Sequence, residues 1–212
     1  MKIHCYEVGR LRSNAYLLEN EESGEGILID CGGDGARLGA LIAQSGIDLQ
    51  AILLTHGHAD HLEGVEALLK VVSCPVYIHQ DDYSYLLKPE WNHSPMIYGK
   101  NICLDIGAIS LEDGEQMEIA GFSVEVIHTP GHTLGSACFL VEDCLFTGDT
   151  LFKDTIGGDF PPHGDTALEI ASIRNRLFTI EKDLVCYPGH GEPTGLHYER
   201  RFNMYCRVED GN

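Results

Sequence analysis

The segment His56-Gly57-His58-Ala59-Asp60-His61 places three imidazoles and one carboxylate within six residues. It follows an apolar run with strand character and precedes a segment with helical character. Residues two apart in an extended chain point to the same side, so His56 and His58 can bind one metal ion. Asp60 and His61 lie where the chain turns toward the helix, and they can bind a second ion. Neutral histidine and ionised aspartate suit zinc, iron or manganese, so the segment predicts a metal site.

Three later segments carry further candidate ligands, each at the end of a predicted strand and beside a glycine: Gly131-His132, Gly148-Asp149 and Gly189-His190. Glycine allows the sharp backbone bend that aims a short side chain at an ion. The combined seven ligands exceed the three or four of one zinc site. They fit two ions about 3.5–4 Å apart that share a carboxylate. We assign the first ion to His56, His58 and His132, the second to Asp60, His61 and His190, and the bridge to Asp149.

Composition limits the classes of protein and of partner. The chain has 212 residues, 43% of them hydrophobic, which predicts a single domain spanning residues 1–212 with a sizeable core. The formal charge of −19 argues against binding to nucleic acid and to anionic membrane surfaces. We therefore expect a small-molecule substrate as the partner. The sequence does not predict an oligomeric state.

The N-terminal segment and the cysteines bear on the cellular compartment. The first residues, Met1 to Glu7, contain no long apolar stretch of the kind found in signal peptides. The eight cysteines are spread along the chain without a Cys-x-x-Cys pair, as expected for buried free thiols. Both features predict a protein of the reducing cytoplasm.

The order of the predicted elements is strands, helices, strands, helices, in two similar halves. This order predicts an α/β (α+β) protein whose two sheets pack face to face with helices outside, an αββα four-layer sandwich. Continuous helices are expected over Leu62 to Val71 and over Thr166 to Phe178. The segment Pro89 to Lys100 shows no periodicity, and we expect a polar loop there that could shape a substrate pocket.

The sequence resembles a known family, the metallo-β-lactamase superfamily. The resemblance rests on Thr-His-Gly-His-Ala-Asp-His, then Gly-His-Thr, Gly-Asp-Thr and Gly-His-Gly, in this order. It extends over nearly the whole chain and implies the αββα sandwich. Asp30, in Leu-Ile-Asp-Cys-Gly, matches the early supporting aspartate of the family, which would orient a ligand loop from behind the metals.

Within the superfamily, the chain looks most like the small glyoxalase II-like (hydroxyacylglutathione hydrolase-like) enzymes. The resemblance implies a binuclear metallohydrolase that cleaves a small acyl thioester with a hydroxide bridging two divalent metal ions, zinc being expected and iron or manganese possible alternatives. Asp149 would bridge the metals, and Asp60 would bind one metal and orient the hydroxide. A glutathione substrate is anionic and would need a local cation; we name Lys153, Arg200 and Arg201 as candidates.

Two departures separate the chain from full glyoxalase II. That enzyme has a helical glutathione-binding domain after the last metal-binding histidine, whereas this sequence ends about twenty residues beyond His190. The family segment Ile-Gly-Arg-Thr-Asp reads Ile156-Gly157-Gly158-Asp159-Phe160 and lacks the arginine. Both departures concern glutathione recognition and leave the metal ligands intact.

Other activities on the same scaffold stay open. A persulfide dioxygenase would use one iron held by His56, His132 and Asp149. A lactonase or another ester hydrolase would use the binuclear site, and a metal-loaded protein without catalytic activity is a further alternative. Among the remaining histidines, His93 has no ligand neighbours in the sequence, and His128 could support the site from behind.

Overall fold

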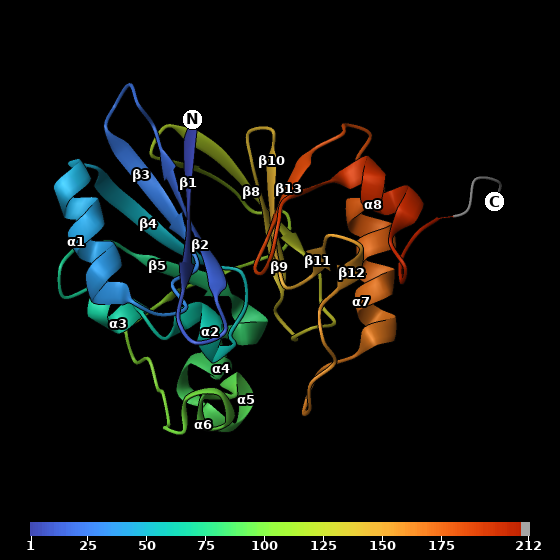
Figure 1. Cartoon of the computed structure of the whole chain (residues 1–212), viewed down its shortest axis with the longest axis horizontal. Coiled ribbons are helices and arrows are strands. Elements are labelled where there is room, and N and C mark those ends of the chain that lie inside the picture. Colours follow the sequence, from blue (N-terminus) through green and yellow to red (C-terminus); the bar gives the residue numbers. More distant parts are fainter. Residues whose placement is uncertain (209–212) are drawn as a thin grey trace.

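The computed structural model describes residues 1–208 as two facing β-sheets between outer helices (Figure 1). The first sheet has the order β1-β2-β3-β4-β5-β6, with bounds Lys2–Val8, Ser13–Glu19, Glu25–Ile29, Asp48–Leu54, Val76–His79 and Ile109–Leu111. The second has the order β14-β13-β10-β9-β8-β7, which are Thr194–Gly195, Val185–Pro188, Cys144–Gly148, Ala137–Val141, Phe122–His128 and Gln116–Ile119. A small hairpin pairs β11, Leu151–Phe152, with β12, Thr155–Ile156.

The helices are short and lie at the outer faces and at one end of the sandwich (Figure 1). Their bounds are α1 Gly35–Ser45, α2 Ala59–Leu62, α3 Val65–Leu68, α4 Tyr83–Leu87, α5 Pro89–Asn92, α6 Ser94–Tyr98, α7 Thr166–Ser172 and α8 Leu196–Phe202. A 3₁₀ turn, Gln80–Asp82, precedes α4, and a π-helical turn, Ile173–Leu177, extends α7.

Three apolar clusters separate the four layers. Helices α1 and α3 pack through Leu38 and Leu68 against one face of the first sheet. The facing sheets enclose a second cluster that includes Leu53 and Phe139, and a third lies between the second sheet and the outer helices. Strand β4 is buried on both faces, because Ile52 points to the outer cluster and Leu53 to the inner one. The predicted αββα sandwich is therefore confirmed.

Two predictions of local structure are wrong. The segment Pro89 to Lys100, expected as a loop, contains α5 and α6, which are too short to show helical periodicity in the sequence. The expected helix over Leu62 to Val71 is shorter and divided, because α2 ends at Leu62 and α3 starts at Val65. Gly64 lies at this break, where it approaches Cys31 too closely to accept a side chain.

Two expectations about the whole chain stay predictions. The single domain over residues 1–212 stays a prediction, and its last four residues, 209–212, lie outside the described part. Within residues 1–208, no helix combines the length and the apolar character needed to cross a lipid bilayer. The expected cytoplasmic location also stays a prediction.

Candidate metal centre

The seven predicted ligands come from four loops that follow strands β4, β8, β10 and β13. Strand β4 leads into His56 and His58, and its continuation into α2 carries Asp60 and His61. The other three loops carry His132, Asp149 and His190, listed here in chain order. The carboxyl ends of these strands lie at one edge of the sandwich, between the two sheets (Figure 1). Segments more than 100 residues apart in the chain therefore meet at one site, since His190 Nε2 lies 3.2 Å from Asp60 Oδ2.

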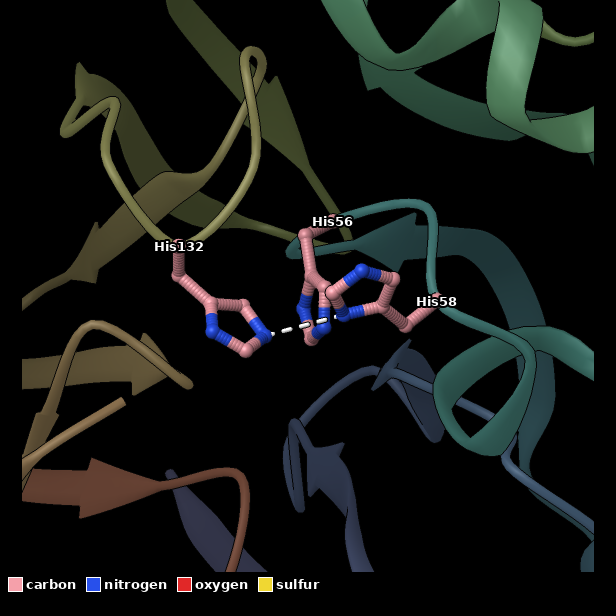
Figure 2. Close-up of side chains that lie close together, drawn as sticks. All are labelled: His56, His58 and His132. Carbon is pink, nitrogen blue, oxygen red and sulfur yellow. Dashed lines mark hydrogen bonds between the residues drawn. The ribbon is translucent and has the colours of Figure 1, made fainter. Parts of the chain in front are cut away.

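The first group contains His56, His58 and His132, all buried. Their rings stand nearly perpendicular to one another, with centroids 4.7–4.9 Å apart and interplanar angles of 78–87°. His58 Nδ1 and His132 Nε2 lie 2.9 Å apart, and His56 reaches toward the same point (Figure 2). Donor atoms of a tetrahedral zinc site lie about 3.3 Å apart, given bonds of about 2.0–2.1 Å. The group therefore has the geometry of three imidazole ligands facing one ion.

The second group contains Asp60, His61 and His190. Its three contacts are similar in length: His190 Nε2 lies 3.2 Å from Asp60 Oδ2 and 3.3 Å from His61 Nε2, and the remaining pair is 3.6 Å apart. Asp60 and His61 are buried, whereas the side chain of His190 is 28% exposed. This second group is therefore as compact as the first but is open to the solvent on one side.

Asp149 lies between the two groups. Its Oδ2 atom is 3.6 Å from His132 Nε2 of the first group and 3.6 Å from His190 Nε2 of the second. Its Oδ1 atom lies 3.3 Å from His61 Nε2. One carboxylate thus faces both positions, as a bridging ligand must.

Two buried atoms of the cluster show that the residues fit metal ions. His56 Nε2 and Asp149 Oδ1 are buried and have no hydrogen-bond partner among the described residues. An unpaired buried polar atom is costly, and a bound metal ion would supply the missing interaction. In His132, the ring nitrogen that faces away from the cluster has a hydrogen-bond partner, because Nδ1 donates to the Gly158 carbonyl oxygen at 2.8 Å. This bond leaves Nε2 facing the cluster with a free lone pair.

Asp30 supports the cluster from behind, at the end of β3. One of its oxygens accepts a hydrogen bond from the Thr55 backbone N–H, and the other accepts from the Thr55 hydroxyl and from His61 Nδ1, each at 2.8 Å. The bond to His61 fixes the tautomer in which Nε2 faces Asp60 and Asp149. Asp30 thus contacts the ligand loop and one candidate ligand, and its role in orienting that loop stays a prediction.

Asp82 is a supporting residue that sequence reasoning missed. Its buried carboxylate accepts hydrogen bonds from the Gly57 N–H at 2.7 Å, the Gly135 N–H at 2.6 Å and the Thr133 hydroxyl at 2.7 Å. It thereby joins the loop of His56 and His58 to the loop of His132. Burial raises the pKa of Asp82 to about 6, and the three donated hydrogen bonds limit that rise.

The pKa values of the histidines shift in opposite directions in the two groups. Burial lowers the pKa of His56 and of His58 well below the usual range and also lowers that of His132, so these rings are neutral at pH 7. Burial also lowers the pKa of His61, but Asp149, Asp60 and Asp30 outweigh it and raise the pKa well above the usual range. The neighbouring histidines hold the pKa of Asp149 well below its usual range, against the effect of burial. A metal ion can replace the proton that these carboxylates hold on His61.

A cavity of about 290 Å³ opens above the cluster. Ligand candidates form its floor, and the apolar side chains of Leu11, Met96, Ile97, Phe152 and Phe160 line the rest. His93 also lines it, with its ring 4.8 Å from that of His58. The Nε2 atom of His93 is buried and has no hydrogen-bond partner among residues 1–208. The backbone of His93 is in the left-handed region, with φ at 62°. The sequence contains no local signal for this position, because only the junction of α5 and α6 brings it there.

The structure does not bring the three predicted substrate cations to this cavity. Lys153 Nζ pairs with Glu192 at 2.8 Å on the surface. Arg200 and Arg201 are exposed on α8, and the Arg201 guanidinium lies 5.4 Å from the Phe202 ring centroid. None of the three is among the residues that line the cavity, and all three are exposed. His128 does not support the cluster either, since its Nε2 pairs with the Leu134 carbonyl oxygen at 2.9 Å.

Comparison with known proteins identifies related chains over almost the full length. Hydroxyacylglutathione hydrolase GloC of Haemophilus influenzae is 30% identical over 208 residues, which cover 97% of this chain and 98% of that protein. The crystal structure of BLEG-1 B3 metallo-beta-lactamase is 33% identical with a TM-score of 0.90, covering 97% of this chain and 99% of that one. The crystal structure of TTHA1623 in a di-iron-bound form is 32% identical with a TM-score of 0.83, covering 95% and 99%.

The family profile described as the metallo-beta-lactamase superfamily matches residues 8–190. This range begins at the end of β1 and ends at the last candidate ligand, His190, so it contains strands β2 to β13 and the whole cluster. The sequence motifs, the four-layer fold and the arrangement of the histidines and aspartates all agree with that match. The chain belongs to the metallo-beta-lactamase superfamily.

Proposed function

We propose that the protein is a metal-dependent hydrolase that cleaves a small acyl thioester, with two divalent cations held by the seven clustered residues. The observation that carries this proposal is the position of Asp149, whose carboxylate faces both ligand groups at 3.3–3.6 Å. A shared carboxylate is the feature that distinguishes a binuclear centre from two separate sites. Similarity to a hydroxyacylglutathione hydrolase over 97% of the chain supports a thioester as the substrate.

Each group of residues would have a distinct task. His56, His58 and His132 would hold one cation, Asp60, His61 and His190 the other, and Asp149 both. The bound cations would supply a water of lowered pKa, from about 15.7 toward about 7, and a Lewis acid for the carbonyl oxygen. Zinc is the metal we propose first, and the di-iron form of a 32% identical relative makes iron the main alternative.

Asp60 is the residue that we propose orients the attacking water. It lines the cavity and is held by His190 Nε2 at 3.2 Å, so its carboxylate has a fixed direction. An ionised carboxylate accepts a hydrogen bond from water and can hold the proton that the water loses. Burial raises the pKa of Asp60, but His61 and His190 more than offset this, so the carboxylate is ionised at neutral pH.

A thioester suits this site better than an amide does. A thiol has a pKa near 8.5, so it can leave as the thiolate with little help from an acid, whereas an amine must be protonated. Among the described cavity residues, the uncommitted proton-bearing group outside the seven candidate ligands is the His93 imidazole. The chemistry of the lining therefore favours a leaving group that needs no strong general acid.

β-Lactam hydrolysis is a second candidate. The specific observation that favours it is the similarity to BLEG-1 B3 metallo-beta-lactamase, with a TM-score of 0.90 over 97% of this chain. The same floor would then act on a strained amide ring. A chromogenic cephalosporin, assayed beside the thioesters at equal concentration, separates the two reactions by the ratio of their kcat/KM values.

The test of the proposed function combines metal analysis with a thioester assay on one preparation. Plasma mass spectrometry should find two transition-metal ions per chain, and a thiol-detecting reagent should record hydrolysis of both S-lactoylglutathione and a neutral acyl thioester. Asp149→Asn should abolish turnover, while Asp48→Asn, an exposed control at the start of β4, should retain it. One iron per chain with oxygen uptake in the presence of a persulfide would instead support the dioxygenase alternative.

A further inference from the structure

We propose that the substrate is an uncharged thioester whose acyl group is apolar, and that this group binds against Leu11, Met96, Ile97, Phe152 and Phe160. We call these five side chains the apolar rim. The inference rests on the thioester hydrolysis proposed above, and it names the class of substrate for that reaction. The proposed substrate differs from a hydroxyacylglutathione in both its acyl group and its thiol.

The apolar rim exposes large apolar side chains directly beside the polar floor. Met96 is 69% exposed, Leu11 48% and Phe160 44%, and all three line the cavity. Solvent-exposed apolar side chains gathered around a concave polar site are typical of a ligand-binding surface. The cavity of about 290 Å³ is at the lower end of the range for small-molecule sites. The lining therefore fits a short apolar chain next to the reacting carbonyl.

Two aromatic rings of the rim flank the two halves of the metal centre. The Phe160 ring centroid lies 6.1 Å from that of His132 and 6.4 Å from that of His58, both edge-on. The Phe152 ring lies 6.2 Å from that of His190, in the second group. An acyl group attached to a carbonyl at the floor would pass between these rings.

The segment that carries Phe160 is held at both ends. On one side, the Gly158 carbonyl oxygen accepts the hydrogen bond from His132 Nδ1 at 2.8 Å. On the other, the Tyr85 hydroxyl and His163 Nδ1 lie 2.8 Å apart, and the Trp91 ring packs edge-on against His163 at 4.4 Å. The Phe160 side of the rim is thus positioned before a ligand arrives, which lowers the ordering cost of binding there.

Charge argues against an anionic thiol such as glutathione. The charged carboxylates of the lining are Asp60 and Asp149, and no lysine or arginine of residues 1–208 lines the cavity. Arg10 adjoins the rim and its guanidinium donates to the Ile97 carbonyl oxygen at 2.7 Å, but Arg10 is not among the residues that line the cavity. Cations at the floor would contact the carbonyl oxygen, whereas the carboxylates of glutathione extend beyond it, over the apolar rim. The net charge of −19 adds to this unfavourable field.

The test uses the metal-loaded full-length protein and straight-chain acyl thioesters of N-acetylcysteamine, a neutral thiol, beside S-lactoylglutathione. We expect kcat/KM to rise by about two- to fourfold per added methylene until the cavity is filled, since full burial of one methylene corresponds to about fourfold. We also expect the preferred neutral thioester to exceed S-lactoylglutathione by at least about tenfold, because each lost pairing of a charged group costs that much or more.

Two pairs of variants assign this selectivity to the rim. Met96→Lys should reduce the gain per methylene and raise the relative rate with S-lactoylglutathione, whereas Met204→Lys should not, although Met204 is equally exposed at 68%. Phe160→Ala should flatten the chain-length series, whereas Phe202→Ala, with 53% exposure on α8, should leave it unchanged. Both members of each pair replace exposed side chains, so a difference between them does not arise from general loss of folding.

The outcomes separate the inference from the function on which it rests. Hydrolysis of thioesters with no dependence on chain length, or with S-lactoylglutathione preferred, would overturn the apolar substrate class and leave the thioester hydrolase standing. Metal-loaded protein that cleaves none of the thioesters would overturn both. A rising series that Met96→Lys and Phe160→Ala alter no more than their controls would also remove the assignment to the rim.

Discussion

Residues 1–208 contain two groups of histidine and aspartate side chains at the ends of strands, and only one of these two groups has the geometry of a metal centre. In both, three ligand atoms lie within 4.8 Å of one another: the seven-residue cluster contains several such sets, and His79, Asp81 and His128 form the other. The imidazoles of the first triad are mutually perpendicular, at 78–87°. His79 and His128 are stacked, with centroids 3.9 Å apart and planes inclined by 13°.

This difference in ring orientation decides what each group can bind. An imidazole nitrogen directs its lone pair in the plane of the ring, so perpendicular rings can direct three lone pairs to one point. Two parallel rings cannot, because an ion placed between them lies outside both planes. His79 Nδ1 and His128 Nε2 are also engaged already, with the Asp81 backbone N–H at 3.3 Å and the Leu134 carbonyl oxygen at 2.9 Å. The directions of the donor lone pairs, rather than the number of donor atoms, therefore distinguish the metal centre from the stacked group.

The largest difference is expected between two variants that each remove one aspartate, Asp60 from the seven-residue cluster and Asp81 from the stacked group. Asp60→Ala should lower the metal content from about two to about one ion per chain and reduce hydrolysis by orders of magnitude, because it removes both a ligand and the group that orients water. Asp81→Ala should change neither quantity. Metal analysis and the thioester assay on both variants measure the contrast, and loss of metal from Asp81→Ala would contradict it.

The stacked group should instead affect stability against acid. Burial and the neighbouring His128 lower the pKa of His79 to about 4 from 6.5. Between these pH values the unfolded chain binds a proton that the folded chain does not, so stability falls as the pH drops through this window. The loss that depends on His79 is at most about 3 kcal/mol, at about 1.36 kcal/mol per pKa unit.

His79→Phe keeps an aromatic ring against His128 and removes the titration. Urea unfolding of the wild type and of this variant at pH 7 and pH 4.5 should show a smaller loss of unfolding free energy in the variant. His197→Phe, at a partly exposed histidine on α8, is the control and should follow the wild type. Equal losses in all three proteins would mean that the stacked group does not titrate as inferred.

A smaller effect is expected from Asp82, which supports the seven-residue cluster and directly follows Asp81 of the stacked group in sequence. Asp82→Asn replaces an acceptor of three hydrogen bonds with an amide whose NH₂ cannot accept, so Gly57, Gly135 or Thr133 loses its partner. Metal affinity should fall by about 10- to 100-fold, as for other residues that position ligands. Asp81→Asn should leave the affinity unchanged. Competition with a chromogenic chelator measures both, and equal affinities would show that Asp82 does not position the ligand loops.

Much of the fold and of the candidate site could be predicted because the signals are local. Buried strands such as β3 and β4 are short apolar runs, and the candidate ligands follow such runs, most of them beside a glycine. Strand ends in this kind of sheet arrangement meet at one edge, so the histidines and aspartates could be grouped before their positions were known.

The remaining features depend on contacts between distant segments. Asp82 is one of two adjacent aspartates in the sequence, and only its bonds to Thr133 and Gly135, about fifty residues away, give it a supporting role. His93 reaches the cavity through two helices too short to leave a periodic pattern. The expected substrate cations lie outside the cavity lining, and the sequence did not indicate this, because surface ion pairs such as that of Lys153 with Glu192 leave no pattern in it.

The shared position of Asp149 has a consequence for how the centre fills. One carboxylate, that of Asp149, faces both groups, so the first ion to bind neutralises most of the negative charge of this carboxylate. The second ion is then attracted less strongly by Asp149 and is also repelled by the first ion. Loading should therefore proceed in two steps of unequal affinity. At limiting metal the population would consist mostly of half-filled chains, instead of a mixture of empty and complete ones. The activity of such a preparation should rise with the second equivalent of metal rather than with the first.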